Sequence, residues 1–326
     1  MKRRDFVALA ATAMAAWPLT GRAQQMRRVG VLLAYTEGDQ EANNRIAAMR
    51  AGLREAGWIE NQNLKIDIHY APGQADRVRA ESNALVSSAP DVVWTNGTPM
   101  TEALKAATKT IPVVFTNVVD PVGSQLVSSL ANPGGNLTGF TNYESSIGGK
   151  WTAVLKELVP TLNRVLIINN PDNLSTSGLV RSAEAAATTL GMKAISAPVR
   201  NAKDVVQAIE SLAREPNGGF ITLPDGRTNS LRNEMLSLAL QHRLPAIYPF
   251  RFFIKEGGMI SYGIDSVAAV RQAATYVDRI LKGTKPAEMP VQNPTKYEMA
   301  INVRTANSIG LIIPESFLLR ADEVIE

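Results

Sequence analysis

Small polar residues follow several short apolar runs of this chain, at the points where each run would end as a strand. In an open parallel sheet, ligands bind beyond the carboxyl ends of the strands. Several of these residues also come directly before a predicted helix, whose free N–H groups and partial positive charge suit a carboxylate or another anion. Together the loops predict a cleft for a small ligand. The candidate ligand-binding residues are Tyr35, Asn96, Thr98, Asn117, Asp120, Asn170, Ser175, Asp225 and Tyr248.

Each of these residues on its own also fits an ordinary structural role. Asn, Asp and Pro after a strand are common turn and helix-capping residues. A capping role suits Asp225 in particular, because a predicted helix begins just after it. The prediction of a cleft therefore depends on the loops taken together.

Motifs typical of enzymes are absent from the sequence. It contains no GxGxxG or GxxxxGK(S/T) phosphate loop and no GxSxG nucleophile elbow. The two histidines, His69 and His242, fall in a predicted strand and near a helix end, which indicates structural roles. Without cysteines or a histidine cluster, thiol catalysis and a transition-metal site are not expected. We predict no catalytic residue, no metal and no cofactor.

Short β-branched runs alternate with helical patterns, and these elements would position the polar loops. This alternation is typical of parallel sheets covered by helices on both faces, so the fold class is α/β. A turn cluster at 132–136 separates two blocks. Strands are predicted at 28–34, 64–70, 91–95, 111–116, 164–168, 192–198, 219–223, 245–248 and 257–263, with 294–302 extended. Helices are predicted around 46–56, 78–86, 98–108, 151–158, 174–190, 205–212, 228–242 and 267–281.

The first residues of the chain predict an export signal. A charged start with Arg3 and Arg4 is followed by an apolar run at 7–19 and by small residues around Ala23. The paired arginines favour the twin-arginine route over an ordinary Sec signal, which remains the alternative. The apolar run is shorter than the roughly 20 residues that span a bilayer, and no cysteine offers a lipid anchor. We predict a signal peptide at 1–23 and a soluble protein in the periplasm.

The signal also carries most of the positive charge. Because residues 1–23 hold four basic residues against one acid, the rest of the chain has a net charge near +1 rather than +4. This balance does not indicate nucleic-acid binding, which needs clustered Lys and Arg. About 300 residues remain, a length typical of two lobes.

Several sequence stretches carry a family resemblance over nearly the whole chain. Besides the twin-arginine start, they are IPVVF at 111–115, DPVG at 120–123, NPGGNLTG at 132–139, LKELVP at 155–160, RLPAIY at 243–248, GMISYG at 258–263, YVDRILKG at 276–283 and LLRADEVI at 318–325. In these stretches the chain resembles the ABC-transporter substrate-binding family whose better-known members bind tryptophan or tyrosine.

The resemblance implies a type I periplasmic-binding fold. In this fold, two Rossmann-like lobes with parallel sheets are joined by three crossovers, here expected near Gly139, near Tyr262 and at 291–294. Lobe 1 would contain residues 27–139 plus 263–290. Lobe 2 would contain 140–262 plus 291–326.

The resemblance also implies roles for some candidates. In related amino-acid binders, the ligand carboxylate meets hydroxyl and N–H groups of lobe 1 and the ammonium meets an acid. Asp225 is the matching acid, and Tyr35 and Tyr248 could stack on the ligand. The positions that match the carboxylate site are Asn96, Thr98, Thr116 and Asn117.

The function that follows is a non-catalytic, monomeric receptor. It would capture an amino acid or related small organic acid, with aromatic ligands among the candidates, and deliver it to an ABC permease and ATPase in the inner membrane. An exported sensor that presents the solute to a membrane signalling partner is the alternative, and an exported enzyme is another. A LacI-like repressor is not favoured, because the signal occupies the place of its DNA-binding helices.

Overall fold

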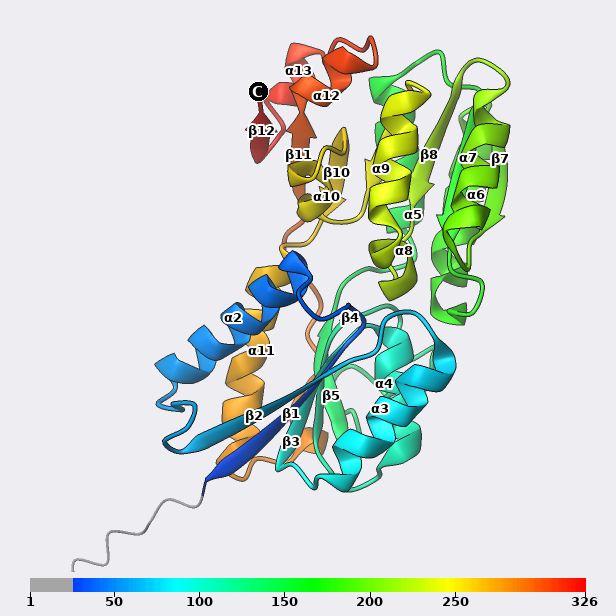
Figure 1. The fold of residues 1–326 in the computed structure, drawn as a ribbon. Helices are drawn as coiled ribbons and strands as arrows, with labels where there is room; N and C mark the ends of the chain where they lie inside the picture. The colour runs from blue at the N-terminus through cyan, green and yellow to red at the C-terminus, as the bar shows by residue number, and fades with distance from the viewer. Residues whose placement is uncertain (1–25) are drawn as a thin grey trace, which may run out of the picture.

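The first lobe is built on a five-stranded parallel sheet with the spatial order β2-β1-β3-β4-β5 (Figure 1). The computed structural model describes residues 26–326, so the predicted signal peptide at 1–23 lies outside the described residues. The strands are β1 (Arg27–Leu33), β2 (Leu64–Tyr70), β3 (Val92–Asn96), β4 (Val113–Val118) and β5 (Leu137–Thr141).

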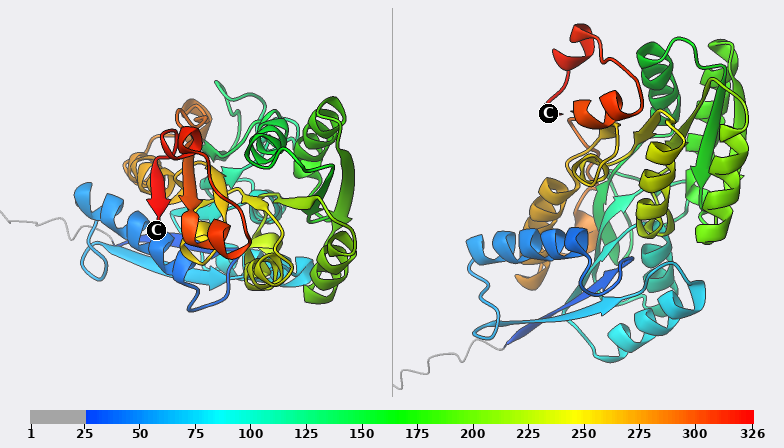
Figure 2. Two further views of the ribbon diagram at one scale, coloured as in Figure 1. Left: turned by 90° about the horizontal axis from the view of Figure 1, so that it is seen from above. Right: turned by 45° about the horizontal axis from the view of Figure 1, so that its top comes forward.

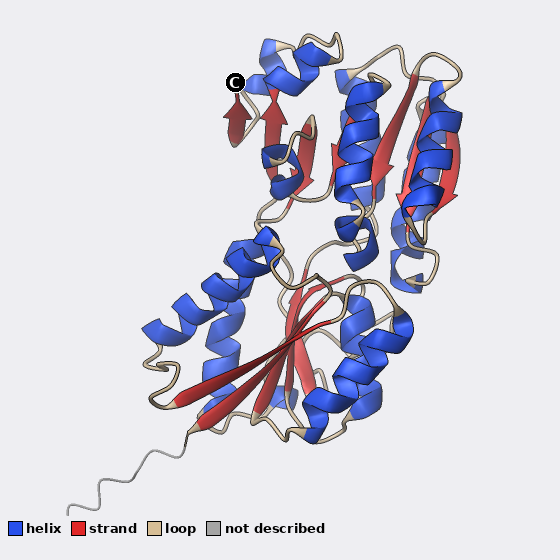
Figure 3. Ribbon diagram, viewed as in Figure 1, coloured by secondary structure: helices blue, strands red, loops and turns tan. Residues whose placement is uncertain are grey.

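Helices cover both faces of this sheet (Figure 3). On one face α11 packs along α2, and on the other α3 packs against α4. Alternate side chains of β1 separate accordingly, since Val31 and Leu33 join the α2 side and Leu32 the α3 side. Both faces of the inner strands are thus buried, as their continuous apolar runs predict. These helices are α2 (Gln40–Glu55), α3 (Ala75–Ser87), α4 (Thr98–Ala107) and α11 (Ser266–Leu281).

The second lobe contains a seven-stranded sheet with the order β12-β11-β10-β9-β8-β6-β7. Its strands are β6 (Arg164–Asn169), β7 (Lys193–Pro198), β8 (Gly218–Thr222), β9 (Ala246–Tyr248), β10 (Ile260–Gly263), β11 (Glu298–Asn302) and β12 (Glu323–Ile325). Strands β6 to β10 run parallel, but β11 pairs antiparallel with β10, so one end of this sheet is mixed.

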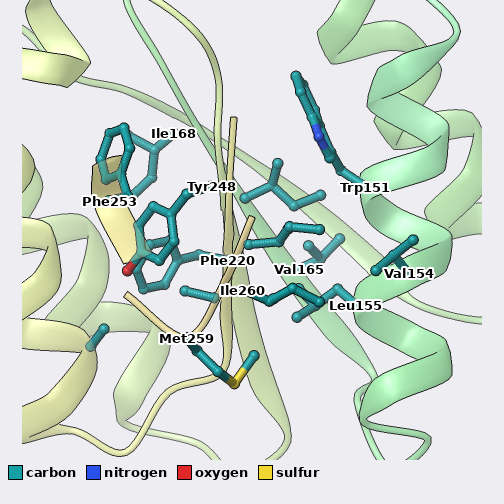
Figure 4. Close-up of a cluster of buried hydrophobic side chains, with 14 of the residues drawn as sticks. Trp151, Val154, Leu155, Val165, Ile168, Phe220, Tyr248, Phe253, Met259 and Ile260 are labelled. Atoms are coloured by element: carbon teal, nitrogen blue, oxygen red, sulfur yellow. The ribbon is translucent and has the colours of Figure 1, made fainter. Parts of the chain in front are cut away.

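The helices of the second lobe surround this sheet and an aromatic-rich core. In Figure 4, Trp151, Val154 and Leu155 of α5 approach the strands from one side, whereas Tyr248 and Phe253 lie on the other. The helices are α5 (Ile147–Leu158), α6 (Ser177–Thr189), α7 (Ala202–Ala213), α8 (Gly226–Ser230), α9 (Arg232–Gln241), α10 (Arg251–Lys255), α12 (Val303–Ser308) and α13 (Glu315–Leu318), with a short 3₁₀ turn η1 (Leu174–Thr176). A second 3₁₀ turn, η2 (Pro286–Glu288), lies against β5 of the first lobe.

The chain passes between the lobes three times. It leaves the first lobe after β5, returns between β10 and α11, and leaves again between η2 and β11. The first and third connections are hydrogen-bonded to each other. The Thr141 N–H donates to the Gln292 carbonyl, and the Gln292 N–H donates to the Gly139 carbonyl. Figure 2 shows α11 beside α2 in the first lobe and the C-terminal residues in the second. The predicted two-lobe α/β architecture is confirmed.

The differences from the prediction concern short elements. The predicted helix at 228–242 is two helices, α8 and α9, which meet at Leu231. Within residues 26–326, no helix is long and apolar enough to span a bilayer.

Candidate ligand-binding site

A cavity of about 270 Å³ lies between the two lobes. The first lobe lines it at the carboxyl ends of β1, β3 and β4, where Ala34, Asn96 and Asn117 lie. The second lobe lines it just beyond β6 and β8, at Asn170 and Asp225. This is the position at which open parallel sheets bind ligands.

The cavity brings together part of the predicted site. The candidates that line it are Asn96, Thr98, Asn117, Asn170 and Asp225. The candidates that do not line it are Tyr35, Thr116, Asp120, Ser175 and Tyr248.

Asp225 is the buried carboxylate of the cavity. One oxygen accepts from the Arg227 N–H at 2.7 Å and from Asn170 Nδ2 at 3.0 Å, and the other accepts from Asn173 Nδ2 at 2.8 Å. Burial nevertheless raises the pKa of Asp225, because the three neutral donors and the charge of nearby Arg227 offset only part of the lost hydration. Asp225 therefore caps α8 and also presents an unneutralised carboxylate at the cavity.

No cation pairs with Asp225 among the residues that the structure describes. The nearby guanidinium of Arg227 pairs instead with Asp172 at 3.3 Å. It also donates to the carbonyl oxygens of Arg200 and Gly73, the latter in the first lobe. A buried carboxylate normally needs a cationic partner, so a cation from a ligand would complete this site.

Two side-chain amides in the cavity also have an unpartnered oxygen. Asn117 and Asn229 are buried, and the Oδ1 atom of each has no hydrogen-bond partner within the described chain. Asn117 lies in the left-handed region, with φ of 55°, at the end of β4. Because buried polar atoms are normally hydrogen-bonded, these amides are available to a ligand.

The first turn of α4 also lines the cavity, with Thr98, Pro99 and Met100. Gly97, with φ of 93°, precedes the helix and gives it no side-chain cap. The Thr98 hydroxyl accepts from the Val119 N–H at 3.2 Å and keeps its own proton available. An uncapped helix start with an adjacent hydroxyl suits a carboxylate.

Thr116 supports this site from beneath rather than lining it. Its hydroxyl oxygen accepts from Asn96 Nδ2 at 3.2 Å and from Trp94 Nε1 at 3.1 Å. It donates to the Thr95 carbonyl at 3.2 Å. Thr116 thus fixes the amide of Asn96.

The two tyrosines predicted to stack on a ligand lie elsewhere. Tyr35 follows Ala34, and alternation along the chain sends its ring to the α2 side, where it lies 5.3 Å from the Arg45 guanidinium carbon. Tyr248 is in the second-lobe core, stacked on Phe253 at 4.8 Å between ring centroids (Figure 4). The aromatic ring that lines the cavity is Phe250.

Asp120 and Ser175 have local roles. Asp120 is exposed, with φ of 42°, and accepts from the Gly123 N–H at 2.9 Å, so it closes a turn. The Ser175 hydroxyl donates to Asn173 Oδ1 at 2.6 Å, which directs the Asn173 amide N–H₂ toward Asp225.

Several residues that line the cavity are not among the candidates predicted from the sequence. Asn173 is in the same loop as Asn170, so its position after a predicted strand was a usable signal, whereas Asn142 follows β5, a strand that was not predicted. Asn229 is one turn into a helix, where no such signal exists. The missed residues include Asn142, Asn173, Arg227, Asn229, Phe250, Glu102 and an apolar wall of Val78, Met100 and Ala103.

Comparison with known proteins identifies the family. The sequence model of the family described as ABC transporter substrate binding protein matches residues 29–325. The chain belongs to this family. A tyrosine-binding protein of Clostridioides difficile strain R20291 is 26% identical over 259 residues, which cover 79% of this chain and 74% of that protein.

Two solved structures show the same fold. A conserved domain protein from Vibrio cholerae has a TM-score of 0.85 at 29% identity, covering 92% of this chain and 100% of that one. An ABC domain in complex with L-Trp, from Streptococcus pneumoniae, has a TM-score of 0.84 at 25% identity, covering 92% and 99%.

These likenesses confirm the predicted family and its type I periplasmic-binding fold. This ABC transporter substrate-binding protein is a solute-binding component of a transporter rather than an enzyme, as the sequence predicts.

Proposed function

We propose that this substrate-binding protein captures an amino acid between its lobes and delivers it to the permease and ATPase of an ABC importer. The observation that carries the proposal is Asp225, a buried carboxylate that forms no ion pair within residues 26–326 and lies at a cavity shared by both lobes. The ammonium group of an amino acid would supply the missing charge.

The opposite end of the ligand fits the start of α4. A ligand carboxylate placed there would accept from the helix N–H groups and from the Thr98 hydroxyl. The side chain would then face the apolar wall of Val78, Met100 and Ala103, with Phe250 beside it. The tyrosine-binding relative and the tryptophan-bound structure support an amino acid as the solute class.

The location of this function is the periplasm. Export would use the leader at 1–23, and the mature protein would meet its transporter at the inner membrane. Closure of the lobes around the solute is the motion that such a fold supports.

A thermal-shift screen tests the proposal. The mature protein is heated with each of the twenty amino acids and, for each one that binds, with its decarboxylated amine and its deaminated acid. At 100 times its dissociation constant, a ligand stabilises the folded state by about 2.7 kcal/mol. We expect at least one amino acid to give this shift and both truncated analogues to lose most of it.

Variants assign the two ends of the ligand. Asp225→Ala and Thr98→Ala should each weaken binding at least tenfold, whereas the turn variant Asp120→Ala should bind as the wild type does. If both cavity variants retain full affinity, the proposed ligand orientation is wrong.

A further inference from the structure

A buried arginine of the first lobe lies against Phe250, an aromatic residue that lines the cavity. Arg45 of α2 is fully buried, and its Nε donates to Glu41 Oε1 at 2.8 Å. The guanidinium carbon lies 5.3 Å from the ring centroid of Tyr35 and 5.8 Å from that of Phe250. Phe250 belongs to the second lobe and lines the cavity, so this contact crosses between the lobes.

Of the three guanidinium nitrogens of Arg45, Nε alone has a hydrogen-bond partner within the described chain. The Nη1 and Nη2 atoms are buried without a hydrogen-bond partner in the described chain. Burying a charge in this way is unfavourable unless other groups stabilise it, and the faces of two aromatic rings do so. The ring of Phe250 is therefore part of what keeps Arg45 stable inside the protein.

Arg45 is itself fixed from the first-lobe side. Its partner Glu41 also accepts from the Ser266 hydroxyl at 3.2 Å, at the start of α11 and just after the second crossover. The cluster thus joins α2, the crossover segment and the cavity wall. Next to it Asp39 pairs with Arg232 of the second lobe at 2.9 Å, so the same side of the interface carries a second, separate contact.

We propose that Arg45 is a positioning residue for solute binding, which holds the Phe250 ring against the first lobe through its guanidinium face. The contact exists only while the lobes meet, because its two sides come from different lobes. Arg45 thereby couples lobe closure to the shape of the cavity wall. The solute side of this proposal rests on the proposed function, whereas the contact between the lobes does not.

A binding cycle with L-tyrosine and L-tryptophan as probes tests the solute side. Arg45→Met should weaken the affinity for whichever probe binds by about tenfold, and Arg45→Lys should recover part of it. In a Phe250→Leu background, Arg45→Met should have little further effect, since the contact is already lost. Equal losses in both backgrounds would show that Arg45 acts only through the stability of its own lobe.

Two control variants keep the cycle interpretable. Arg50→Met, also on α2, removes a more exposed arginine that pairs with Glu60 and should leave affinity unchanged. The single variant Arg45→Met leaves the Glu41 carboxylate buried and unpaired, which could unfold the protein. Glu41→Gln combined with Arg45→Met removes both buried charges and provides a folded protein in that case.

A distance measurement tests the contact without any solute. Because the chain has no cysteine, Ala80→Cys and Leu174→Cys, at exposed positions on the two lobes, can carry spin labels without background. Arg45→Met should shift the unliganded distance distribution toward longer separations. An unchanged distribution would overturn the proposed role between the lobes. If neither probe binds the wild type but the distances shift, the solute is neither of these two amino acids and the contact stands.

Discussion

At the scale of single residues, the main feature of the cavity is the Asp225 carboxylate, which forms no ion pair within the described part of the chain. Three hydrogen-bond donors hold its carboxylate in place, yet none of them carries a charge. The nearest arginine, Arg227, pairs with Asp172 instead. The protein thus maintains a carboxylate that is oriented but not neutralised, which is the state a cationic ligand group requires.

This arrangement predicts that the Asp225 carboxylate, which serves ligand binding, lowers the stability of the unliganded protein. Its raised pKa means that the folded state keeps the proton after the unfolded chain has lost it, near pH 4. This group's contribution to the free energy of unfolding therefore falls as the pH rises above about 4. Asparagine does not titrate, so Asp225→Asn removes this pH-dependent loss of stability. The unliganded variant should therefore gain stability relative to the unliganded wild type as the pH rises from 4 to 7. Urea unfolding at several pH values measures it, and a constant difference would contradict the prediction.

The same scale shows where sequence reasoning reached its limit. The positions of polar residues after strands predicted Asn96, Thr98, Asn117, Asn170 and Asp225 at one cavity. Direction was harder to predict than position, because neighbouring side chains alternate. Ala34 lines the cavity while Tyr35 turns to α2. Phe250, two residues after Tyr248, lines the cavity because it lies beyond the end of β9, whereas Tyr248 is within the strand and the core.

At the scale of elements, the second lobe depends on close approach between helices. Gly148 of α5 lies so near α6 that a Cβ atom there would be 2.2 Å from the Leu179 carbonyl oxygen. At the next residue, Gly149, a Cβ atom would lie 3.1 Å from the Ser182 hydroxyl and 3.3 Å from the Ser182 carbonyl oxygen, contacts that a shift of a few tenths of an ångström relieves. One glycine is therefore required by backbone packing and its neighbour is not.

Alanine substitution should separate these two glycines. Gly148→Ala must displace α6 and should cost about 1–3 kcal/mol of unfolding free energy. Gly149→Ala should be neutral or stabilise by up to about 1 kcal/mol, because alanine favours helix. The urea midpoints of the two variants give the comparison, and equal losses would contradict the packing argument.

Element prediction succeeded where a segment was long enough to show its period. Most apolar strands of both sheets and helices such as α11 follow from their patterns, but β5, the strand LTGFT, was not predicted. Elements of three to six residues, such as α10, α12 and β12, are too short for the apolar periodicity of a helix or strand to be recognised in the sequence. The antiparallel pairing of β11 with β10 is set by the path of the chain between the lobes, which a local pattern does not encode.

At the scale of the whole molecule, a buried ion pair joins the two lobes. Arg232 of α9 reaches Asp39 at the start of α2, and both side chains are nearly inaccessible to solvent. Asp39 also caps α2 by accepting from the Glu41 and Ala42 N–H groups. Separating the lobes must break the pair, so it favours the closed form.

Asp39→Asn isolates the charge, because asparagine caps a helix as well as aspartate does. We expect several-fold weaker solute affinity, chiefly through faster dissociation, with the helix content of the wild type. Stopped-flow binding and circular dichroism measure the two quantities. Unchanged dissociation would mean that the ion pair does not contribute to closure.

Export is the second prediction at this scale. If the leader uses the twin-arginine route, Arg3→Lys combined with Arg4→Lys should block appearance of the mature protein in the periplasm. Fractionation followed by immunoblotting gives the result. Continued export would assign the leader to the Sec route, and the proposed location would remain.

The position of a bound amino acid in a co-crystal structure tests the central claim most directly. The amino acid with the largest thermal shift should lie between the lobes, with its ammonium in contact with Asp225 and its carboxylate at the start of α4. A ligand bound outside this cavity, or one with its carboxylate at Asp225, would contradict the account.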